Sequence, residues 1–498
     1  MKVESFNNTS WKKGRIKKDQ INKYCKGSSD FIRDESIIDT LNRNHSPDKK
    51  KIIDILAKSR SIATLSMDET AALLNVNQPD MLSQMKESAA IVKKKIYDNR
   101  IVTFAPLYLG NHCINDCLYC GFRHSNKDIE RAALSTDEIL SETQTLAGSI
   151  GHKRLIVVYG EHPLNDIDYM VDSIKSIYGV KVPTKRGYGQ IRRVNVNAPA
   201  LSIEELKRLA GCGIGTYQIF QETYHHQTYS KIHPQRTVKG NYKWRLYAVH
   251  RAFEASIDDV GLGALFGLYD WKFEVLALAA HNIELEKTFG VGAHTISFPR
   301  LLPAINTPFT TNAAFKVSDE DFMKIILVLR LCVPHTGLII TARENAEIRR
   351  KSLSLGITQT DASTRIGIGS YSKETSSQVA SKQQFILGDT RSLDELIMEF
   401  AELGYITSFC TAGYRCQRTG KCIMELLREC QEAKFCKLNA VLTFREWLDD
   451  FASEKTLLAG EKIINKEIDE IKKSLPDYYQ RFKLYYERIK RGERDLYF

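Results

Sequence analysis

The spacing of apolar residues along the chain changes near residue 100. Before that point apolar residues recur at helical intervals, as in Lys49–Ser59 and Met81–Tyr97. After it, short apolar or β-branched runs alternate with longer amphipathic segments. We therefore expect a helical region over residues 1–100, followed by strands that alternate with helices.

Eight of the short runs are predicted to be strands. Helices are expected between most of them, and sequences typical of a capping box begin at Ser135 and at Ser202. Regular alternation predicts a parallel sheet, and eight repeats favour a closed (β/α)8 TIM barrel of the α/β class. The predicted strands are Ile101–Leu109, Arg154–Gly160, Arg193–Asn197, Thr216–Gln221, Asp259–Phe266, His294–Pro299, Gly337–Ala342 and Thr358–Arg365.

This pattern divides the chain into three predicted parts. Residues 1–100 form a helical N-terminal region and residues 101–375 form the barrel. Residues 376–498 form a helical C-terminal region that contains cysteines.

Polar and charged residues stand where nearly every predicted strand stops. In a (β/α)8 barrel the active site lies at these C-terminal strand ends. Any single residue of this kind is more often a helix cap or a surface group, and Asn197 and Ser363 are the best candidates for caps. The repetition of the pattern from strand to strand is what indicates an active site.

Three cysteines, Cys113, Cys117 and Cys120, follow the first predicted strand with the spacing C-x3-C-x2-C. Thiolates suit iron–sulfur clusters, which usually take four of them. Three thiolates hold three irons of a cubane and leave the fourth iron open. The alternative is zinc, for which His112 offers a fourth ligand, but zinc sites are usually two separated pairs and no second pair follows.

The cysteine loop resembles that of radical S-adenosylmethionine (SAM) enzymes, in which SAM chelates the open iron and is cleaved to a 5′-deoxyadenosyl radical. Further segments are similar to the tyrosine-lyase branch of that family, which includes the [FeFe]-hydrogenase maturases and the enzymes that make 2-iminoacetate for thiazole. The similarity runs from about residue 50 to residue 455. The segments are Tyr-Gly-Glu-His-Pro from Tyr159, Gln-Glu-Thr-Tyr-His from Gln221, Gly-Leu-Gly-Ala-Leu-Phe-Gly-Leu-Tyr-Asp from Gly261, His-Thr-Ile-Ser-Phe-Pro-Arg from His294 and Thr-Ala-Arg-Glu from Thr341.

The resemblance implies cofactors and a reaction. Cys113, Cys117 and Cys120 hold a [4Fe–4S] cluster to which SAM is chelated. The radical removes a hydrogen from the amine of L-tyrosine, the Cα–Cβ bond breaks, and p-cresol and dehydroglycine form. Conversion of dehydroglycine to CO and cyanide for the hydrogenase cluster stays open. The residues that the resemblance assigns to SAM are Glu161 at its amine, Glu222 and Arg245 at its ribose or methionine part, and Asn197.

The residue types suit an amino-acid substrate. A carboxylate is gripped best by an arginine, and we expect Arg343 to do this, with Ser297 and Arg300 near it. The tyrosine amine must be neutral to lose a hydrogen atom, so a base is needed, and His294 is a candidate. His294 is alternatively an iron ligand at a second site, or simply a buried structural histidine.

The C-terminal region departs from the family pattern. In the hydrogenase maturases, three cysteines spaced C-x2-C-x22-C hold an auxiliary cluster. Here Cys410 and Cys436 match the first and third ligands, but the second position is Gly413. Three interpretations stay open: Cys416 or Cys422 substitutes, the site holds a different or incomplete cluster, or the auxiliary cluster is lost.

The composition of the chain indicates its cellular compartment and the partners it can bind. The chain has 498 residues and eleven cysteines, which without a secretory signal indicates metal ligands in a reducing, cytoplasmic compartment. The net charge of +11 comes without a nucleic-acid-binding motif, so we expect no nucleic acid, and no apolar window is long enough for a membrane span. Expected partners are L-tyrosine, an electron donor such as flavodoxin or ferredoxin, and other hydrogenase maturation proteins.

Three rival functions remain. One keeps the barrel and changes the substrate to another aromatic amino acid or a cofactor precursor. A second is a 2-iminoacetate synthase of the thiazole type. The third is a non-catalytic iron–sulfur carrier, against which the polar strand ends argue, because a carrier needs no amino-acid pocket.

Overall fold

The structure is a computed structural model that describes residues 8–498 except 26, 28, 374–377 and 431. The predicted boundary between residues 375 and 376 lies outside the described residues. The strands are β1 Arg100–Gly110, β2 Arg154–Tyr159, β3 Val182–Pro183, β4 Tyr188–Gly189, β5 Arg193–Asn197, β6 Tyr217–Gln218, β7 Val260–Gly263, β8 Thr295–Ser297, β9 Gly337–Ile340, β10 Gln359–Asp361 and β11 Ile406–Ser408.

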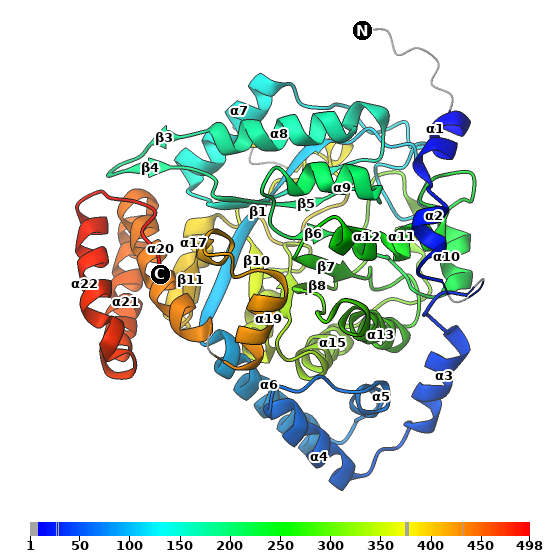
Figure 1. Ribbon diagram of the computed structural model, residues 1–498, viewed down its shortest axis with the longest axis horizontal. Coiled ribbons are helices and arrows are strands. Elements are labelled where there is room, and N and C mark those ends of the chain that lie inside the picture. The colour runs from blue at the N-terminus through cyan, green and yellow to red at the C-terminus, as the bar shows by residue number, and fades with distance from the viewer. Residues whose placement is uncertain (1–7, 26, 28, 374–377, 431) are drawn as a thin grey trace.

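Eight of these strands form a closed parallel barrel (Figure 1). Their order around the barrel is β1, β2, β5, β6, β7, β8, β9 and β10, and β10 pairs with β1 to close the ring. Each of the eight predicted strands overlaps one of them, so the predicted (β/α)8 fold is confirmed. β1 extends one residue beyond its prediction at each end and β5 agrees with its prediction, whereas the other six strands are shorter than predicted, most of all β6, β7 and β10.

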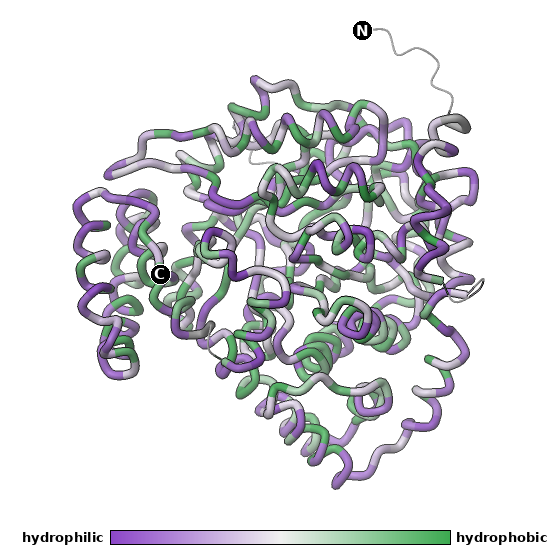
Figure 2. The backbone as a smooth tube through the Cα atoms, in the orientation of Figure 1, coloured by the Kyte–Doolittle hydropathy of each residue, from purple (hydrophilic) through white to green (hydrophobic). Residues whose placement is uncertain are grey.

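Helices surround the barrel and cover its outer face. α6 contacts α15, and α5 contacts α13, so the N-terminal helices lie against the outer helices rather than against the strands. Apolar (green) and polar (purple) segments alternate along these helices in Figure 2, as expected for helices with one buried face. The helices up to the end of the barrel are α1 Asn8–Arg15, α2 Asp19–Asn22, α3 Asp34–Arg43, α4 Lys49–Arg60, α5 Met67–Leu74, α6 Pro79–Tyr97, α7 Thr136–Gln144, α8 Ile167–Gly179, α9 Ile203–Ala210, α10 His226–Ile232, α11 Tyr242–Leu246, α12 Ala248–Glu254, α13 Trp271–Phe289, α14 Pro308–Thr311, α15 Asp319–Cys332 and α16 Ala346–Ser352.

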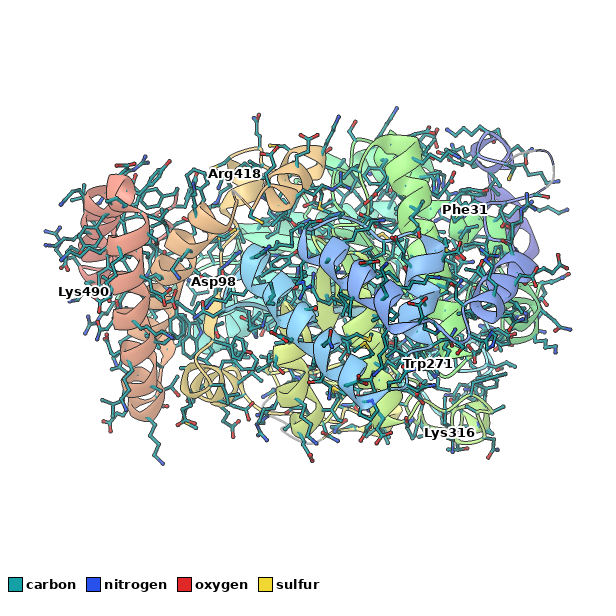
Figure 3. The ribbon with its side chains drawn as sticks, turned by 90° about the horizontal axis from the view of Figure 1, so that it is seen from below. Phe31, Asp98, Trp271, Lys316, Arg418 and Lys490 are labelled. Carbon is teal, nitrogen blue, oxygen red and sulfur yellow. The ribbon has the colours of Figure 1, made fainter. Side chains whose placement is uncertain are left out.

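The C-terminal region builds a second hydrophobic core beside the barrel. Buried side chains of α17, α20 and α21 meet there, and α22 packs on α20 at the edge of the molecule, where Lys490 is labelled in Figure 3. These helices confirm the predicted helical extension. They are α17 Leu393–Glu402, α18 Ala412–Arg415, α19 Gly420–Arg428, α20 Glu432–Phe451, α21 Glu454–Ser474 and α22 Pro476–Lys490.

Two strand pairings were not predicted. β11 pairs in parallel with the first residues of β1, Arg100 to Val102, and joins the C-terminal region to the barrel sheet. β3 and β4 form a short antiparallel hairpin outside the barrel. In the part of the chain that the structure describes, no helix is both long and apolar enough to cross a bilayer.

Candidate active site

A cavity of about 230 Å³ opens within the barrel at the C-terminal strand ends. Its lining comes from the cysteine loop after β1 and from segments at the ends of the following strands. The structure thus brings together most of the predicted site residues. Those that line the cavity are Cys113, Cys117, Cys120, Glu161, Asn197, Glu222, Arg245, Ser297 and Arg343.

The cysteine loop is held at both sides by backbone hydrogen bonds. The N–H of Ile114 donates to the carbonyl of Glu161 at 2.8 Å, and the N–H of Leu118 donates to the carbonyl of Ile232 at 3.1 Å. Position 160 must be glycine, since a Cβ there would lie 2.2 Å from the carbonyl oxygen of His112. The loop is therefore fixed by the neighbouring strand end before any ligand binds.

Two thiols of this loop, those of Cys113 and Cys117, resist ionisation because of their surroundings. Burial raises the pKa of Cys113 to about 11 and that of Cys117 to about 12. Thiolates, not thiols, ligate metals, so these groups need a nearby positive charge to lose their protons. A cationic iron centre supplies that charge, and its binding would release protons.

Glu161 presents one unused oxygen to the cavity. The side-chain amide of Asn115 donates to its Oε2, whereas its buried Oε1 has no hydrogen-bond partner. Burial raises the pKa of this carboxyl above its usual range. A buried acceptor without a donor is costly, and a ligand ammonium would satisfy it.

Glu222 lies between two cations at the end of β6. Its Oε1 is 2.7 Å from Nζ of Lys239 and 3.3 Å from a guanidinium nitrogen of Arg245. Glu222 has a φ of 74°, a left-handed conformation that costs a side-chain-bearing residue about 1–3 kcal/mol. Such strain is retained where neighbours over-determine the position, and here it aims the carboxylate into the cavity.

Arg343 follows β9 and brings a half-buried positive charge to the cavity lining. Its guanidinium stacks 3.4 Å from the ring centroid of Phe385, and burial lowers its pKa below the usual range. Among the described residues no carboxylate forms an ion pair with it. Ser297, at the end of β8, also lines this cavity. The guanidinium is therefore available for an anionic group.

These observations test whether an iron–sulfur cluster and SAM fit the site. Three thiols gathered in one loop that lines the cavity, and an unpaired carboxylate oxygen at Glu161, match the open-iron cluster and the SAM amine. The paired charges of Glu222 and Arg245 offer acceptors and donors to the rest of SAM. The donor set fits both groups.

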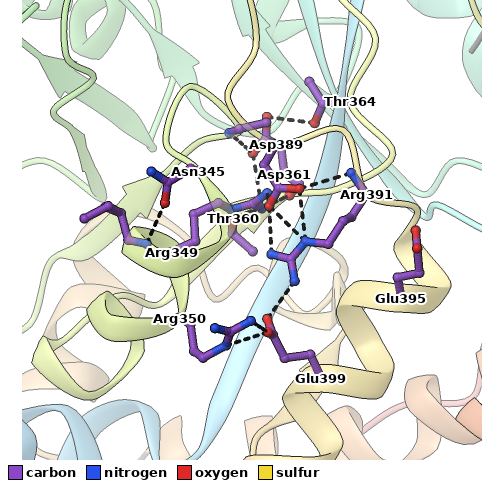
Figure 4. A network of polar contacts seen from close by, with 12 residues as sticks. Asn345, Arg349, Arg350, Thr360, Asp361, Thr364, Asp389, Arg391, Glu395 and Glu399 are labelled. Atoms are coloured by element: carbon purple, nitrogen blue, oxygen red, sulfur yellow. Dashed lines mark hydrogen bonds and ion pairs between the residues drawn. The ribbon is translucent and has the colours of Figure 1, made fainter. Parts of the chain in front are cut away.

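A buried network behind β9 and β10 supports Arg343 (Figure 4). Asp361 ends β10, and its carboxylate accepts hydrogen bonds from the N–H of Ala342 at 2.7 Å and from the hydroxyl of Thr364 at 2.9 Å. Arg349 lies between Asp361 and Asp389. The network fixes the backbone that leads into Arg343.

Two predicted residues do not reach the cavity. Arg300 forms ion pairs with Glu344 and Asp319, so its charge is neutralised beside the barrel end. His294 precedes β8 and therefore lies at the N-terminal end of the barrel, with Nδ1 3.8 Å from a carboxylate oxygen of Asp259. His294 therefore does not line the cavity and is not placed to act as a base on a substrate bound there.

The C-terminal cysteines also lie at the N-terminal end of the barrel. Cys410 follows β11, and its carbonyl accepts a hydrogen bond from Arg154 at 2.9 Å. Burial lowers the pKa of Arg100, but the neighbouring sulfurs of Cys436 and Cys410 raise it above its ordinary value. Cys410 and Cys436 therefore share one neighbour. The Sγ of Cys416 instead lies 3.9 Å from the carbonyl oxygen of Phe498.

Three cavity residues escaped the sequence analysis. Gln384 donates from its amide to the Sγ of Cys120 at 3.3 Å, and it comes from a segment beyond the barrel that carries no motif. The N–H of Lys239 donates to Asn115 at 2.9 Å, which joins the pairs around Glu161 and Glu222. Asn115 lies between Cys113 and Cys117 in the sequence, and this position could have identified it as a site residue.

One cluster of acidic groups away from the cavity, Asp98, Glu467 and Glu470, has the spacing of a metal site (Asp98 is labelled in Figure 3). The Nζ of Lys437 lies 2.7–2.8 Å from an oxygen of each of these carboxylates. The ammonium group occupies the place of a cation, so the cluster is a structural ion-pair network.

Comparisons with known proteins agree with this geometry. The profile of the radical SAM superfamily matches residues 107–279, and that of the biotin and thiamin synthesis associated domain matches residues 297–406. A 2-iminoacetate synthase of Salmonella typhimurium is 30% identical over 319 residues, which cover 64% of this chain and 80% of that protein.

Two solved structures are similar over nearly the whole chain. A crystal structure of HydG, a maturase of the [FeFe]-hydrogenase, has a TM-score of 0.89 and 44% identity, covering 94% of this chain and 100% of that one. HydG from Carboxydothermus hydrogenoformans has a TM-score of 0.76 and 34% identity, covering 95% and 99%.

Proposed function

Because this chain belongs to the radical SAM superfamily, we propose that it is a lyase that cleaves the Cα–Cβ bond of L-tyrosine to give p-cresol and dehydroglycine. The observation that carries the proposal is the cavity itself. Its lining contains three thiols, near the loop after β1, and a half-buried arginine after β9 that forms an ion pair with no described carboxylate. A free amino acid with a carboxylate and an aromatic ring matches the part of the lining around this arginine.

When bound, the reduced cluster and SAM supply a 5′-deoxyadenosyl radical. Cys113, Cys117 and Cys120 would ligate the cluster, and Glu161 would accept from the SAM amine through its unpaired Oε1. Glu222, oriented by Lys239 and Arg245, would hold the ribose or methionine part of SAM. We also keep Asn197 as a SAM contact, since it lines the cavity.

Arg343 would bind the tyrosine carboxylate and so place the amine toward the thiol side of the cavity. Apolar neighbours such as Phe385, Leu387 and Leu302 line the same space and exclude water. A dry pocket favours a neutral amine, because desolvation disfavours the charged form. This removes the need for His294 as a base. Its other predicted role, as a ligand to a metal at the N-terminal end of the barrel, stays a prediction.

Each turnover consumes two electrons, one to cleave SAM and one, with a proton, to reduce the cresol radical to p-cresol, so we expect a small donor such as flavodoxin or ferredoxin as a partner in the cytoplasm. Hydrogenase maturation proteins are further candidate partners, because the similar HydG structures carry that name.

The experiment is an anaerobic assay of reconstituted protein with dithionite, SAM and L-tyrosine. p-Cresol should form, with at least as much 5′-deoxyadenosine, and absence of p-cresol would refute the lyase. Cys117→Ala should abolish 5′-deoxyadenosine release, and Arg343→Gln should reduce p-cresol far more than Arg350→Gln, an exposed arginine paired with Glu399. Release of 5′-deoxyadenosine with tryptophan but not with tyrosine would instead favour the rival substrate.

A further inference from the structure

Residues 410–430 lie against the N-terminal end of the barrel, where Thr419 and Gly420 bond to the carboxylates of Asp258 and Asp259 just before β7. Cys410 follows β11, and Cys436 lies in the first turns of α20. The guanidinium of Arg100, the first residue of β1, is close to both sulfurs. The structure thus brings two thiols to this end of the barrel. A cubane usually takes four thiolates, or three when one iron is left for another ligand.

From this arrangement we propose that the protein carries a single iron–sulfur cluster, in the cavity, and that it releases its two-carbon product as dehydroglycine instead of converting it to CO and cyanide. The second half of this statement rests on the proposed tyrosine cleavage. The first half concerns iron content alone and stands independently of the substrate.

Gly413 is the first reason. It lies in α18, and its φ is outside the left-handed region, so the backbone does not require glycine there. A Cβ at this position would meet only the carbonyl oxygen of Arg418, at 3.1 Å. The fold would therefore nearly accept a side chain at position 413. The backbone conformation does not require glycine there, and glycine cannot supply the second thiolate of the family pattern.

Cys416 cannot replace the missing ligand, because the chain terminus covers it. Its Sγ faces the carbonyl oxygen of Phe498. That residue is fixed by Asn439, which accepts from its N–H at 2.8 Å and donates to its carbonyl at 3.2 Å, and by Arg418, which donates to the same carbonyl at 3.1 Å. Phe498 is therefore fixed beside Cys416, and moving Cys416 toward Cys410 would separate its Sγ from this neighbour.

The two remaining cysteines of the region point elsewhere. Cys422 is exposed on α19. Cys430 packs at the edge of an apolar cluster that contains Val92 and Ile96 of α6. The described residues therefore offer two thiols at this site, one fewer than an open-iron cubane needs.

The fate of the product follows from its chemistry. Dehydroglycine is an imine, and water adds to its C=N bond. The C–N bond then breaks, giving glyoxylate and, with one proton, ammonium. No oxidant or reductant is consumed. In this chain the imine is thus available either to a following enzyme that uses 2-iminoacetate or to hydrolysis in solvent.

The first test measures iron and sulfide in the full chain after anaerobic reconstitution. We expect about four irons per chain, as for one cubane. Gly413→Cys should raise the count about twofold, and the matched variant Gly413→Ser should not. Cys410→Ser should leave the count of the natural chain unchanged. About eight irons in the natural chain, or a loss of iron in Cys410→Ser, would overturn the proposal. A Gly413→Cys chain that stays at four would overturn the assignment of the missing ligand to position 413.

The second test follows products. With tyrosine and SAM, glyoxylate should match p-cresol, and CO bound by deoxyhaemoglobin and cyanide should stay at the level of a Cys117→Ala control. CO or cyanide formed in proportion to p-cresol would overturn this inference, although the proposed lyase activity would be supported. Absence of p-cresol would instead refute the lyase, and the iron count would still decide the number of clusters.

Discussion

The carboxylate of Asp361 accepts a hydrogen bond from the backbone N–H of Ala342 at 2.7 Å. Ala342 directly precedes Arg343, so the last residue of β10 fixes the position from which the cavity's guanidinium projects. The same carboxylate is held by Thr364 and lies 3.7 Å from Arg349. Asp361 is thus a positioning residue for the proposed substrate arginine.

Asp361→Ala should raise the KM for tyrosine by about tenfold or more, since a hydrogen bond to a charged group contributes about 1.5–3 kcal/mol. Release of 5′-deoxyadenosine without tyrosine should be unchanged, because the cysteine loop and Glu161 do not contact Asp361. Initial rates of p-cresol formation across tyrosine concentrations measure this. Asp319→Ala, which removes an exposed carboxylate, is the control. An equal loss of both reactions would indicate general damage to the barrel.

Glu161→Gln should weaken SAM binding by about 10- to 100-fold, because the neutral amide loses the charge that attracts the SAM ammonium. Equilibrium dialysis with the iron-loaded protein gives the affinity directly, without turnover. Glu347→Gln, an exposed site, should bind SAM normally. Unchanged affinity in Glu161→Gln, with iron content also unchanged, would remove Glu161 from the SAM site.

Glu446 joins the C-terminal region to the barrel through a buried ion pair that depends on pH. Its Oε2 lies 2.7 Å from Arg192 and 3.1 Å from Lys153. Burial raises its pKa, but these two cations lower it to about 2. The folded state thus binds fewer protons than the unfolded state. The stabilisation, about 3 kcal/mol, is complete above pH 4.5 and is lost as the pH falls through about 2.

Glu446→Gln should lower the free energy of unfolding at pH 7 by about 3–5 kcal/mol, because Lys153 and Arg192 remain buried without their partner. The difference from the natural chain should shrink below pH 4.5. Urea unfolding followed by circular dichroism at several pH values measures both effects. Glu461→Gln, at a half-exposed carboxylate, should cost far less. A difference that is constant from pH 7 to pH 3 would contradict the assignment.

His226 fastens the N-terminal segment to α10. Burial lowers its pKa, but hydrogen bonds to Asp30 and Asp34 raise it to about 9. Because the folded pKa lies above the ordinary value, the stabilisation is present below pH 6.5 and disappears as the pH rises through about 9.

We therefore expect His226→Asn to speed tryptic cleavage at Arg33 relative to the natural chain at pH 7, and to make no difference at pH 10. The ratio of the two rates at each pH removes the protease's own pH dependence. Cleavage at Lys490, at the end of α22, serves as an internal reference. An equal ratio at pH 7 and pH 10 would show that the imidazolium does not fasten this segment.

The fold could be predicted from the sequence because its periodicity is strong. Each β-branched run became a barrel strand, and the capping-box serines Ser135 and Ser202 begin α7 and α9 as expected. β11 escaped because its three residues, Ile406 to Ser408, are too few to show a period. Their pairing with β1 depends on tertiary contact.

The site was predictable only in part. His294 and Ser297 lie in the same run, yet one is at the start of a strand and the other at its end, and a run alone does not show where the strand begins. Arg300 was expected near the substrate, but Glu344, at the next strand end, neutralises it. Two charges that pair across neighbouring strands are far apart in sequence, so only the folded chain reveals the pair.

β1 connects the C-terminal cysteines, which lie near its beginning, with the cysteine loop of the cavity, which follows its end. Arg100 at its beginning lies near the thiols of Cys410 and Cys436. Its last residue, Gly110, is about 33 Å away at 3.3 Å per residue, and Cys113 follows three residues later. β11 forms its ladder with the beginning of that same strand. The C-terminal region is consequently not an independent module. A chain truncated before Ile406 would lose β11 and with it the hydrogen bonds to the beginning of β1, the strand that leads into the cysteine loop. Chimaeras made between relatives should therefore exchange β1 and β11 together.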